Sequence, residues 1–338
     1  MRTEWGTRVW LNEVGQWISG PLTHLHGTPA SDLVWHATQP WSTVWTVDCG
    51  GSRYWFKANR QSRREGVVQA AVADLAPDYV DAPVAADPSR GWVLTRDRGP
   101  ILAQLWAGTR DLETEALVPV LVDYARLQRR TLRCRERLVA AGVREALPQA
   151  AAESARAQAS YLRDLSVGDP RRITDDEYSR VLAALPLLRK AATGLADGPV
   201  PLALDQCDLW PGNVFPPTGV GAHRFFDFAD AVWAHPFGSL VMLAVECVFR
   251  WQVPQPDSAI DLRDGRIRTV FDAYLRQWSD FAPLDELREL LTSALRVAAL
   301  HRSGAWLRNL AEATTEELAT YGSKPWAWLE DVTKPVLF

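Results

Sequence analysis

Residues 204–230 read LDQCDLWPGNVFPPTGVGAHRFFDFAD. In this stretch an acid, Asp208, stands five residues before an amide, Asn213, and a second acid, Asp227, follows the last of two short apolar runs separated by a Pro/Gly turn. Turn chemistry alone could explain the first part, because Asp and Asn favour Asx turns and Pro-Gly interrupts regular structure. A carboxylate, an amide and a second carboxylate on one loop could also accept a proton from a hydroxyl and hold Mg²⁺ between nucleotide phosphates.

The segments DLWPGN and FFDF resemble the catalytic and metal-binding segments of the aminoglycoside phosphotransferase and choline kinase group, distant relatives of protein kinases. The resemblance implies an α/β (α+β) protein-kinase-like fold, with an antiparallel sheet and a helix in the N-lobe and a mostly helical C-lobe. It implies Mg²⁺ and ATP or GTP as requirements for phosphorylating a hydroxyl of a small molecule. Carried over by position, Asp208 is the catalytic base, and Asn213 and Asp227 are the metal ligands.

The sequence departs from the family pattern at two places. The His-Gly that precedes the catalytic acid in the family is Gln206-Cys207 here, and the Asp usual a few residues after the metal-binding loop is replaced near Gly238-Ser239. The family residues support loop geometry more than they perform chemistry. A catalytically weakened pseudokinase, acting as a nucleotide- or ligand-binding module, is therefore the alternative. A protein kinase is disfavoured, because no Ala-Pro-Glu segment or long activation loop follows Asp227.

A lysine in the N-terminal third completes the pattern. Lys57 lies near the end of a strand-like run, where the resemblance implies a lysine that holds the α- and β-phosphates. A lysine at a strand end is by itself usually a surface residue. Glu65, early in the next predicted helix, would face Lys57 in a kinase-like arrangement, although helix dipoles also favour acids at that position.

Alternating aromatic, β-branched and polar residues predict an antiparallel sheet before Lys57 and after it. The expected strands are residues 33–37, 43–48 and 53–58, with a hairpin turn at 49–52, followed by 83–84 and 91–95. A helix over residues 5–18, stopped by Gly20-Pro21, is expected to pack on this sheet with its tryptophans in the core. A second helix is expected over residues 60–75.

The turn at residues 38–42 occupies the place where kinases have a phosphate-covering loop, but it contains no glycine. Ser42 and Thr43 are the candidates for phosphate contacts there. The polar segment 96–100 marks the expected boundary between an N-lobe, residues 1–96, and a C-lobe, residues 97–338.

The C-lobe pattern is helical. Helices are expected within residues 101–195, with an apolar face that includes Leu117, Leu121, Tyr124 and Leu127, and again over 240–251. The arginine-rich run at 129–137 is expected to be a solvated helix face.

Charge and cysteine content restrict the partners. With 37 basic and 41 acidic residues the formal charge is −4, so no nucleic-acid surface is indicated. Four scattered cysteines indicate neither a disulfide framework nor a zinc motif. The N-terminus lacks a signal-peptide pattern and no apolar run is long enough to span a bilayer, so a cytoplasmic protein without a membrane or obligate protein partner is expected.

The acceptor cannot be chosen from the sequence. The resemblance suggests an aminoglycoside, another antibiotic, an amino sugar or a choline-like amino alcohol. Asp230 has three open interpretations: a metal ligand, an acceptor ligand or a turn cap. His235 is expected to be structural. Acidic and aromatic side chains could line a site for a cationic or sugar-like molecule, but any C-lobe contains such residues: Asp205, Asp230, Glu246, Trp210, Trp233, Trp251 and Trp306.

Overall fold

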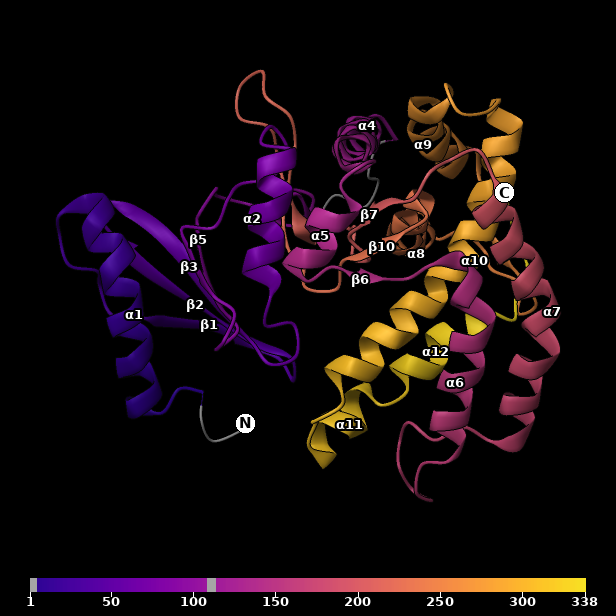
Figure 1. Ribbon diagram of the computed structural model, residues 1–338, viewed down its shortest axis with the longest axis horizontal. Helices are drawn as coiled ribbons and strands as arrows, with labels where there is room; N and C mark the ends of the chain where they lie inside the picture. Colours follow the sequence, from indigo (N-terminus) through magenta and orange to yellow (C-terminus); the bar gives the residue numbers. More distant parts are fainter. Residues whose placement is uncertain (1–4, 108–113) are drawn as a thin grey trace.

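The computed structural model describes residues 5–107 and 114–338 and has two lobes (Figure 1). One lobe is a five-stranded sheet with a helix on each side, and the other consists mainly of helices. This confirms the predicted α+β, two-lobed architecture. No helix in the described part of the chain is long and apolar enough to cross a membrane.

The N-lobe sheet is antiparallel, in the order β1-β2-β3-β5-β4. Gly50 and Gly51, both with positive φ, make the expected tight turn between β2 and β3. Lys57 lies between Val44 and Val93 on the neighbouring strands, so all three side chains point to the same face. The strand bounds are β1 (Val34–Thr38), β2 (Ser42–Cys49), β3 (Ser52–Asn59), β4 (Ala85–Asp87) and β5 (Trp92–Arg96).

Helix α1 (Arg8–His26) covers the opposite face of the sheet. It runs through Gly20-Pro21, so the predicted stop there was wrong. Buried residues continue at helical spacing to Leu22, and this packing holds the helix past the proline, which removes only one backbone hydrogen bond. The helix ends at Gly27, whose φ of 67° allows its N–H to bond Thr23 O at 2.8 Å.

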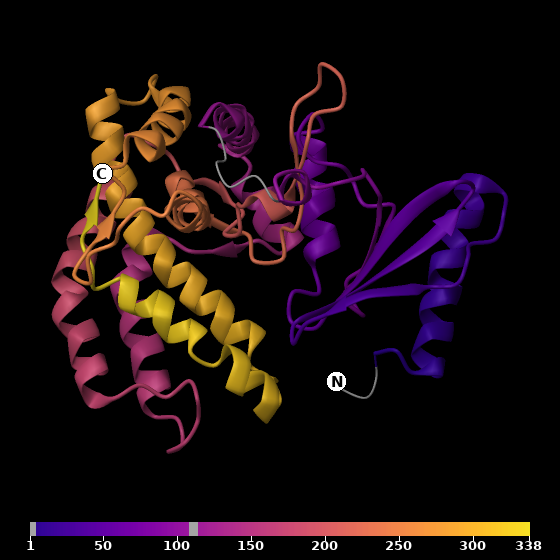
Figure 2. The same ribbon diagram turned by 180° about the vertical axis from the view of Figure 1, so that it is seen from behind.

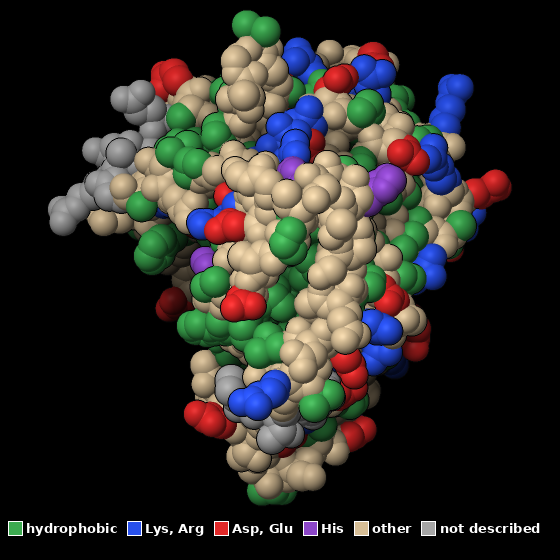
Figure 3. All heavy atoms as spheres, turned by 90° about the vertical axis from the view of Figure 1, so that its left-hand side faces the viewer, with side chains coloured by type: hydrophobic (Ala, Val, Ile, Leu, Met, Phe, Trp, Pro, Cys, Tyr) green, Lys and Arg blue, Asp and Glu red, His purple; other side chains and the backbone are tan. Residues whose placement is uncertain are grey.

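The tryptophans of α1 belong to the core, as predicted. Trp10 packs on Trp45 and Trp17 on Trp92, with ring centroids 5.8 and 5.6 Å apart. Seen from the N-lobe side, acidic and basic side chains are interspersed over the surface, as the nearly balanced composition predicts (Figure 3).

Helix α2 (Glu65–Leu75) begins five residues later than expected and joins the lobes. Val68 and Val72 are buried in the same apolar cluster as the C-lobe helices, whereas the sheet and α1 form a separate cluster. The N-terminal end of α2 is thereby held between the sheet and the C-lobe, where it presents Glu65.

The C-lobe helices confirm the predicted helical pattern. The predicted apolar face on α4 is buried throughout, and Arg129, Arg135 and Arg137 form ion pairs at the surface. Residues 108–113, within the range expected to be helical, lie outside the described residues. The helix bounds are α3 (Leu102–Leu105), α4 (Thr114–Thr131), α5 (Arg135–Ala141), α6 (Ala151–Arg163), α7 (Asp175–Asp197), α8 (Leu240–Arg250), α9 (Gly265–Leu275), α10 (Leu284–Asn309), α11 (Thr315–Tyr321) and α12 (Lys324–Asp331).

Short strands carry the segment around Asp208. They form a three-stranded sheet of order β6-β10-β7 and a two-stranded pair, β8-β9, which bonds through Phe225 to the segment after α2. Helices α10 and α12 run side by side (Figures 1 and 2). The bounds are β6 (Arg144–Glu145), β7 (Ala203–Asp205), β8 (Val214–Phe215), β9 (Arg224–Phe225) and β10 (Val232–Ala234); β11 (Ile260–Asp261) pairs with β12 (Val336–Leu337) elsewhere.

Candidate active site

Lys57 stands between two carboxylates. Its Nζ lies 2.9 Å from an oxygen of Glu65 and 2.9 Å from Asp227 Oδ2, and Asn59 Nδ2 bonds the same Glu65 carboxylate at 2.6 Å. The lysine therefore joins β3, α2 and the loop after β9. The structure brings together three residues that the sequence analysis assigned to nucleotide and metal binding.

Charge pairing and burial shift the pKa values of this group. Burial alone would lower the pKa of Lys57, but Asp227 and Glu65 raise it, so the ammonium stays charged. Burial raises the pKa of Glu65 to about 7, although Lys57 opposes this rise. A nucleotide phosphate would therefore meet a permanently charged lysine.

The loop after β7 presents Asp208. Asn213 Nδ2 donates to the backbone oxygen of Asp208 at 2.9 Å and to its Oδ2 at 3.0 Å, which closes the five-residue loop on itself. The Arg302 guanidinium lies 3.2 Å from Asp208 Oδ1 and donates to Cys207 O at 3.1 Å. Burial raises the pKa of Asp208 above its ordinary value, and Arg302 opposes that rise.

Two residues beside this chemistry have left-handed backbone. Cys207 has φ 63° and Asp227 has φ 60°, a conformation that costs a non-glycine residue about 1 kcal/mol or more. Local strain of this kind is held in place only by surrounding structure. It therefore marks the segments before Asp208 and at Asp227 as constrained.

A hydrogen-bond network replaces the two missing family features. Gln206 Nε2 donates to the backbone oxygens of Phe226 and Asp227 and so ties the Asp208 loop to the Asp227 loop. Asp205 Oδ1 accepts from the backbone N–H of Cys207 and from Ser239 Oγ, each at 2.7 Å. The carboxylate that supports the loop thus belongs to Asp205, at the end of the strand before the loop. Ser239 binds the same carboxylate oxygen.

Two further buried side chains, Tyr124 and Gln128, stabilise this network by hydrogen bonds. Tyr124 bonds Ser239 Oγ at 2.8 Å, and Gln128 Nε2 donates to Leu204 O, Pro236 O and Ser239 Oγ. All of these side chains are buried. The two sequence departures therefore leave the loop anchored.

Asp230 lies among arginines. Three guanidinium groups from β6 and α10 surround it at 3.6–3.9 Å, those of Arg144, Arg302 and Arg308. These contacts leave it poorly suited to bind a metal, so of the three open interpretations only an acceptor-side role and a local structural role remain.

Four of the other acceptor candidates lie away from the Asp208 carboxylate. Asp205 is fully buried behind the loop, and Glu246 pairs with Arg250 on α8. Trp233 is buried, and Trp251 is buried beneath Arg266. His235 is buried next to Phe237, as expected for a structural histidine, and burial lowers its pKa to about 3.

Lys57 and Asp227 line two adjoining cavities. A cleft of about 370 Å³ lies under the sheet and is the size of a pocket for a small ligand. A narrow cavity of about 50 Å³ lies between Lys57, Asp208 and Asp227. Ser42 lines the larger cleft, whereas the hydroxyl of Thr43 is buried and bonds Thr38 and the Trp45 indole.

Trp41 of the N-lobe lines the narrow cavity and packs against two aromatic residues of the C-lobe. Trp41, in the turn between β1 and β2, packs edge-on against Trp306 and Tyr321, with centroids 5.3 and 5.6 Å apart. Tyr321 also donates to Gln39 Oε1 at 2.8 Å. These contacts of Trp41 and Gln39 with Trp306 and Tyr321, which we call the latch, therefore hold the turn at residues 38–42 against α10 and α11. This is the turn where the sequence predicts phosphate contacts.

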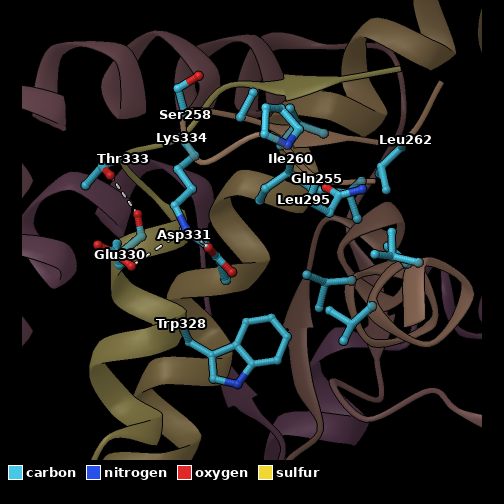
Figure 4. A pocket seen from close by; sticks show the side chains of 18 of the residues that line it. Gln255, Ser258, Ile260, Leu262, Leu295, Trp328, Glu330, Asp331, Thr333 and Lys334 are labelled. Atoms are coloured by element: carbon cyan, nitrogen blue, oxygen red, sulfur yellow. Dashed lines mark hydrogen bonds and ion pairs between the residues drawn. The ribbon is translucent and has the colours of Figure 1, made fainter. Parts of the chain in front are cut away.

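A larger cavity lies elsewhere in the described part of the chain. It measures about 790 Å³ and is lined by none of Lys57, Asp208, Asn213 or Asp227. Figure 4 shows Lys334 beside Glu330 and Asp331 on one side and the aliphatic side chains of Ile260, Leu262 and Leu295 on the other. Volume alone therefore does not identify the site.

The donor set near Asp227 suits Mg²⁺. Asn213 uses its amide nitrogen toward Asp208, which leaves its carbonyl oxygen as a ligand, and the Asp227 carboxylate is partly exposed. Both are hard oxygen donors of the kind that magnesium prefers. These two residues would hold the ion.

Sequence reasoning missed Arg302 and Asn59. Asn59 lies two residues after Lys57 on the same strand face, and this spacing could have drawn attention to it. Arg302 is 95 residues beyond Cys207 in a helix, where no local pattern distinguishes it from other arginines.

No protein-family model matches this sequence, and a search of curated proteins finds no match. Solved structures do resemble it. A macrolide 2′-phosphotransferase type I aligns with a TM-score of 0.59 at 14% identity, covering 94% of this chain and 97% of that one. A GDP complex of aminoglycoside 2′-phosphotransferase-IIIa gives 0.56 at 13%, covering 94% and 98%. A choline/ethanolamine kinase family protein from Mesorhizobium loti gives 0.57 at 15%, covering 94% of each chain. The chain therefore has the kinase-like fold of these small-molecule phosphotransferases.

Proposed function

We propose that this protein is a Mg²⁺-dependent phosphotransferase that moves the γ-phosphoryl group of ATP or GTP to a hydroxyl of a small molecule. One observation carries the proposal: Lys57 and, from a distant part of the sequence, Asp208 and Asp227 line one cavity that adjoins a cleft large enough for a small ligand. The nucleotide complexes among the structures with this fold support the choice of co-substrate.

Each residue has a separate task. Lys57, held by Glu65, neutralises phosphate charge, and Mg²⁺ bound by Asn213 and Asp227 would add to that neutralisation. Asp208 accepts the proton of the acceptor hydroxyl and orients its oxygen toward the phosphoryl group. Arg302 opposes the rise that burial causes in the pKa of Asp208.

The charged groups around the narrow cavity nearly balance. Its lining includes the carboxylates of Asp208, Asp227 and Asp230 and the ammonium of Lys57. Arg144, Arg302 and Arg308 lie next to Asp230 and offset part of the negative charge. The charge therefore does not rank one class of acceptor above another, and the acceptor panel has to include cationic, neutral and anionic compounds.

The test is Mg²⁺-dependent release of ADP or GDP in the presence of candidate acceptors. The panel holds aminoglycosides, amino sugars, amino alcohols, macrolides, nucleosides and hydroxy acids. We expect stimulation by at least one of these compounds and loss of that stimulation in Asp208→Asn. Tight Mg·nucleotide binding without any stimulated turnover would favour the binding module, and no nucleotide binding would refute the proposal.

The Trp41 contact predicts a measurable effect on substrate binding. Trp41→Ala removes two aromatic pairs, each worth about 0.5–1.5 kcal/mol, so the closed turn is weakened by a factor of roughly 5 to 150. We expect the KM of the nucleotide to rise by about that factor. The matched control is Trp35→Ala, an exposed indole on β1 outside the latch. Equal KM values in the two variants would contradict a role for the latch.

A further inference from the structure

Three side chains with metal-binding chemistry meet behind the Asp208 loop. Asp205 ends β7, Cys207 follows in the loop, and His301 comes from the middle of α10. One donor atom of each residue lies within 4.8 Å of the donors of the other two. None of these residues is assigned to phosphoryl transfer above, apart from the support that Asp205 Oδ1 gives the loop.

Two of these donors have no other role in the described structure. Asp205 Oδ2 and His301 Nδ1 are buried, and neither has a hydrogen-bond partner among residues 5–107 and 114–338. A buried polar atom without a partner costs about 1–3 kcal/mol. Asp205 is fully buried, and the Nδ1 atom of His301 is inaccessible to solvent although the residue as a whole is partly exposed, so bulk water does not offset that cost.

The donor types point to one class of ion. A thiolate, an imidazole and a carboxylate are ligands of Zn²⁺ and similar borderline-soft cations, whereas Mg²⁺ prefers oxygen alone. Around a tetrahedral zinc such donors lie roughly 3.3–3.8 Å apart, from bonds of about 2.0–2.3 Å. With the donors within 4.8 Å of one another, the closing movement required is at most about 1.0–1.5 Å.

We propose that Asp205, Cys207 and His301 form a binding site for a zinc-like divalent cation, with a water or other small ligand in the fourth position. The ion would fix the segment that precedes Asp208 to α10. This site is separate from the Mg²⁺ ligands Asn213 and Asp227, and the proposal does not depend on the phosphotransferase activity.

Cobalt(II) provides a direct test on the full-length, reduced protein, because thiolate coordination gives an intense charge-transfer absorption. We expect one equivalent of Co²⁺ to produce this band, Zn²⁺ to abolish it, and excess Mg²⁺ to leave it unchanged. Cys207→Gly should lose the band. Glycine suits the left-handed φ of 63° at this position, so the variant is expected to fold.

Two further variants complete the design. Cys247→Ser changes another buried cysteine, outside the cluster, and should keep the band. His301→Leu removes a ring nitrogen that makes no hydrogen bond, and should weaken Co²⁺ binding at least 10-fold. Zn²⁺ should raise the Tm of the wild type and not that of Cys207→Gly. Absence of the band in the wild type, or an equal band in Cys207→Gly, would overturn the proposal.

Discussion

Asp208→Asn is expected to lower turnover by ~10²–10⁴-fold while leaving the Kd of the nucleotide nearly unchanged. The substitution keeps the shape of the side chain and removes the group that takes the acceptor proton. Lys57 and Asp227 lie on the nucleotide side of the cavity and keep their mutual contact at 2.9 Å. The effect should therefore fall on kcat, with little change in nucleotide affinity.

The measurement pairs steady-state ADP or GDP release with direct nucleotide binding, once an acceptor is known. Asp285→Asn serves as the matched control, because this carboxylate is 91% exposed and remote from the cavity. Near-normal turnover in Asp208→Asn would remove Asp208 from the role of base. A parallel loss of nucleotide affinity would indicate that the loop had moved.

Local spacing explains what the sequence could predict. The five-residue separation of Asp208 and Asn213 is a property of one loop, and the structure shows why: the Asn213 amide bonds the Asp208 backbone and side chain. Lys57 could be placed because it ends a strand-like run between a predicted hairpin and a predicted helix, where the resemblance implies a phosphate-binding lysine; in the structure it lies on the face opposite the core residue Phe56. Such signals need no knowledge of distant contacts.

The rest depends on contacts between distant segments. The pairing of Gln39 with Tyr321 spans 282 positions, and nothing in either local sequence indicates it. The path of α1 through Pro21 was mispredicted because packing under the helix outweighed a local breaker. The significance of Gln206 was also hidden, since its amide reaches the backbone of the Asp227 loop only in the folded chain.

Arg302→Met is expected to lower the free energy of unfolding by about 3–5 kcal/mol at neutral pH, the usual result of removing one partner of a buried ion pair. The Arg302 side chain is 8% exposed and lies 3.2 Å from Asp208 and 3.7 Å from Asp230. Methionine has a similar length, so loss of packing contributes little. Asp208, whose side chain is 28% exposed, then loses its guanidinium partner, whereas Asp230 keeps Arg144 and Arg308.

The loss of stability in Arg302→Met should depend on pH. Burial already raises the pKa of Asp208, and removing Arg302 raises it further, so the folded variant binds more protons than the unfolded chain in the acidic range. Stability of the variant relative to the wild type therefore falls as pH rises through that window, and the difference should be larger at pH 8 than at pH 5. The acid limb of kcat should also move to higher pH, because Asp208 must be ionised to act as a base.

Urea denaturation of the wild type and the variant at both pH values measures the first effect, and the pH profile of turnover measures the second. Arg276→Met is the matched control, since its side chain is 60% exposed and contacts Asp272 only at 3.9 Å. A pH-independent loss of stability would mean that Arg302 acts through packing. An unchanged acid limb together with that result would show that Asp208 owes its ionisation to other groups, and Arg302 would then serve only to position the loop through Cys207 O.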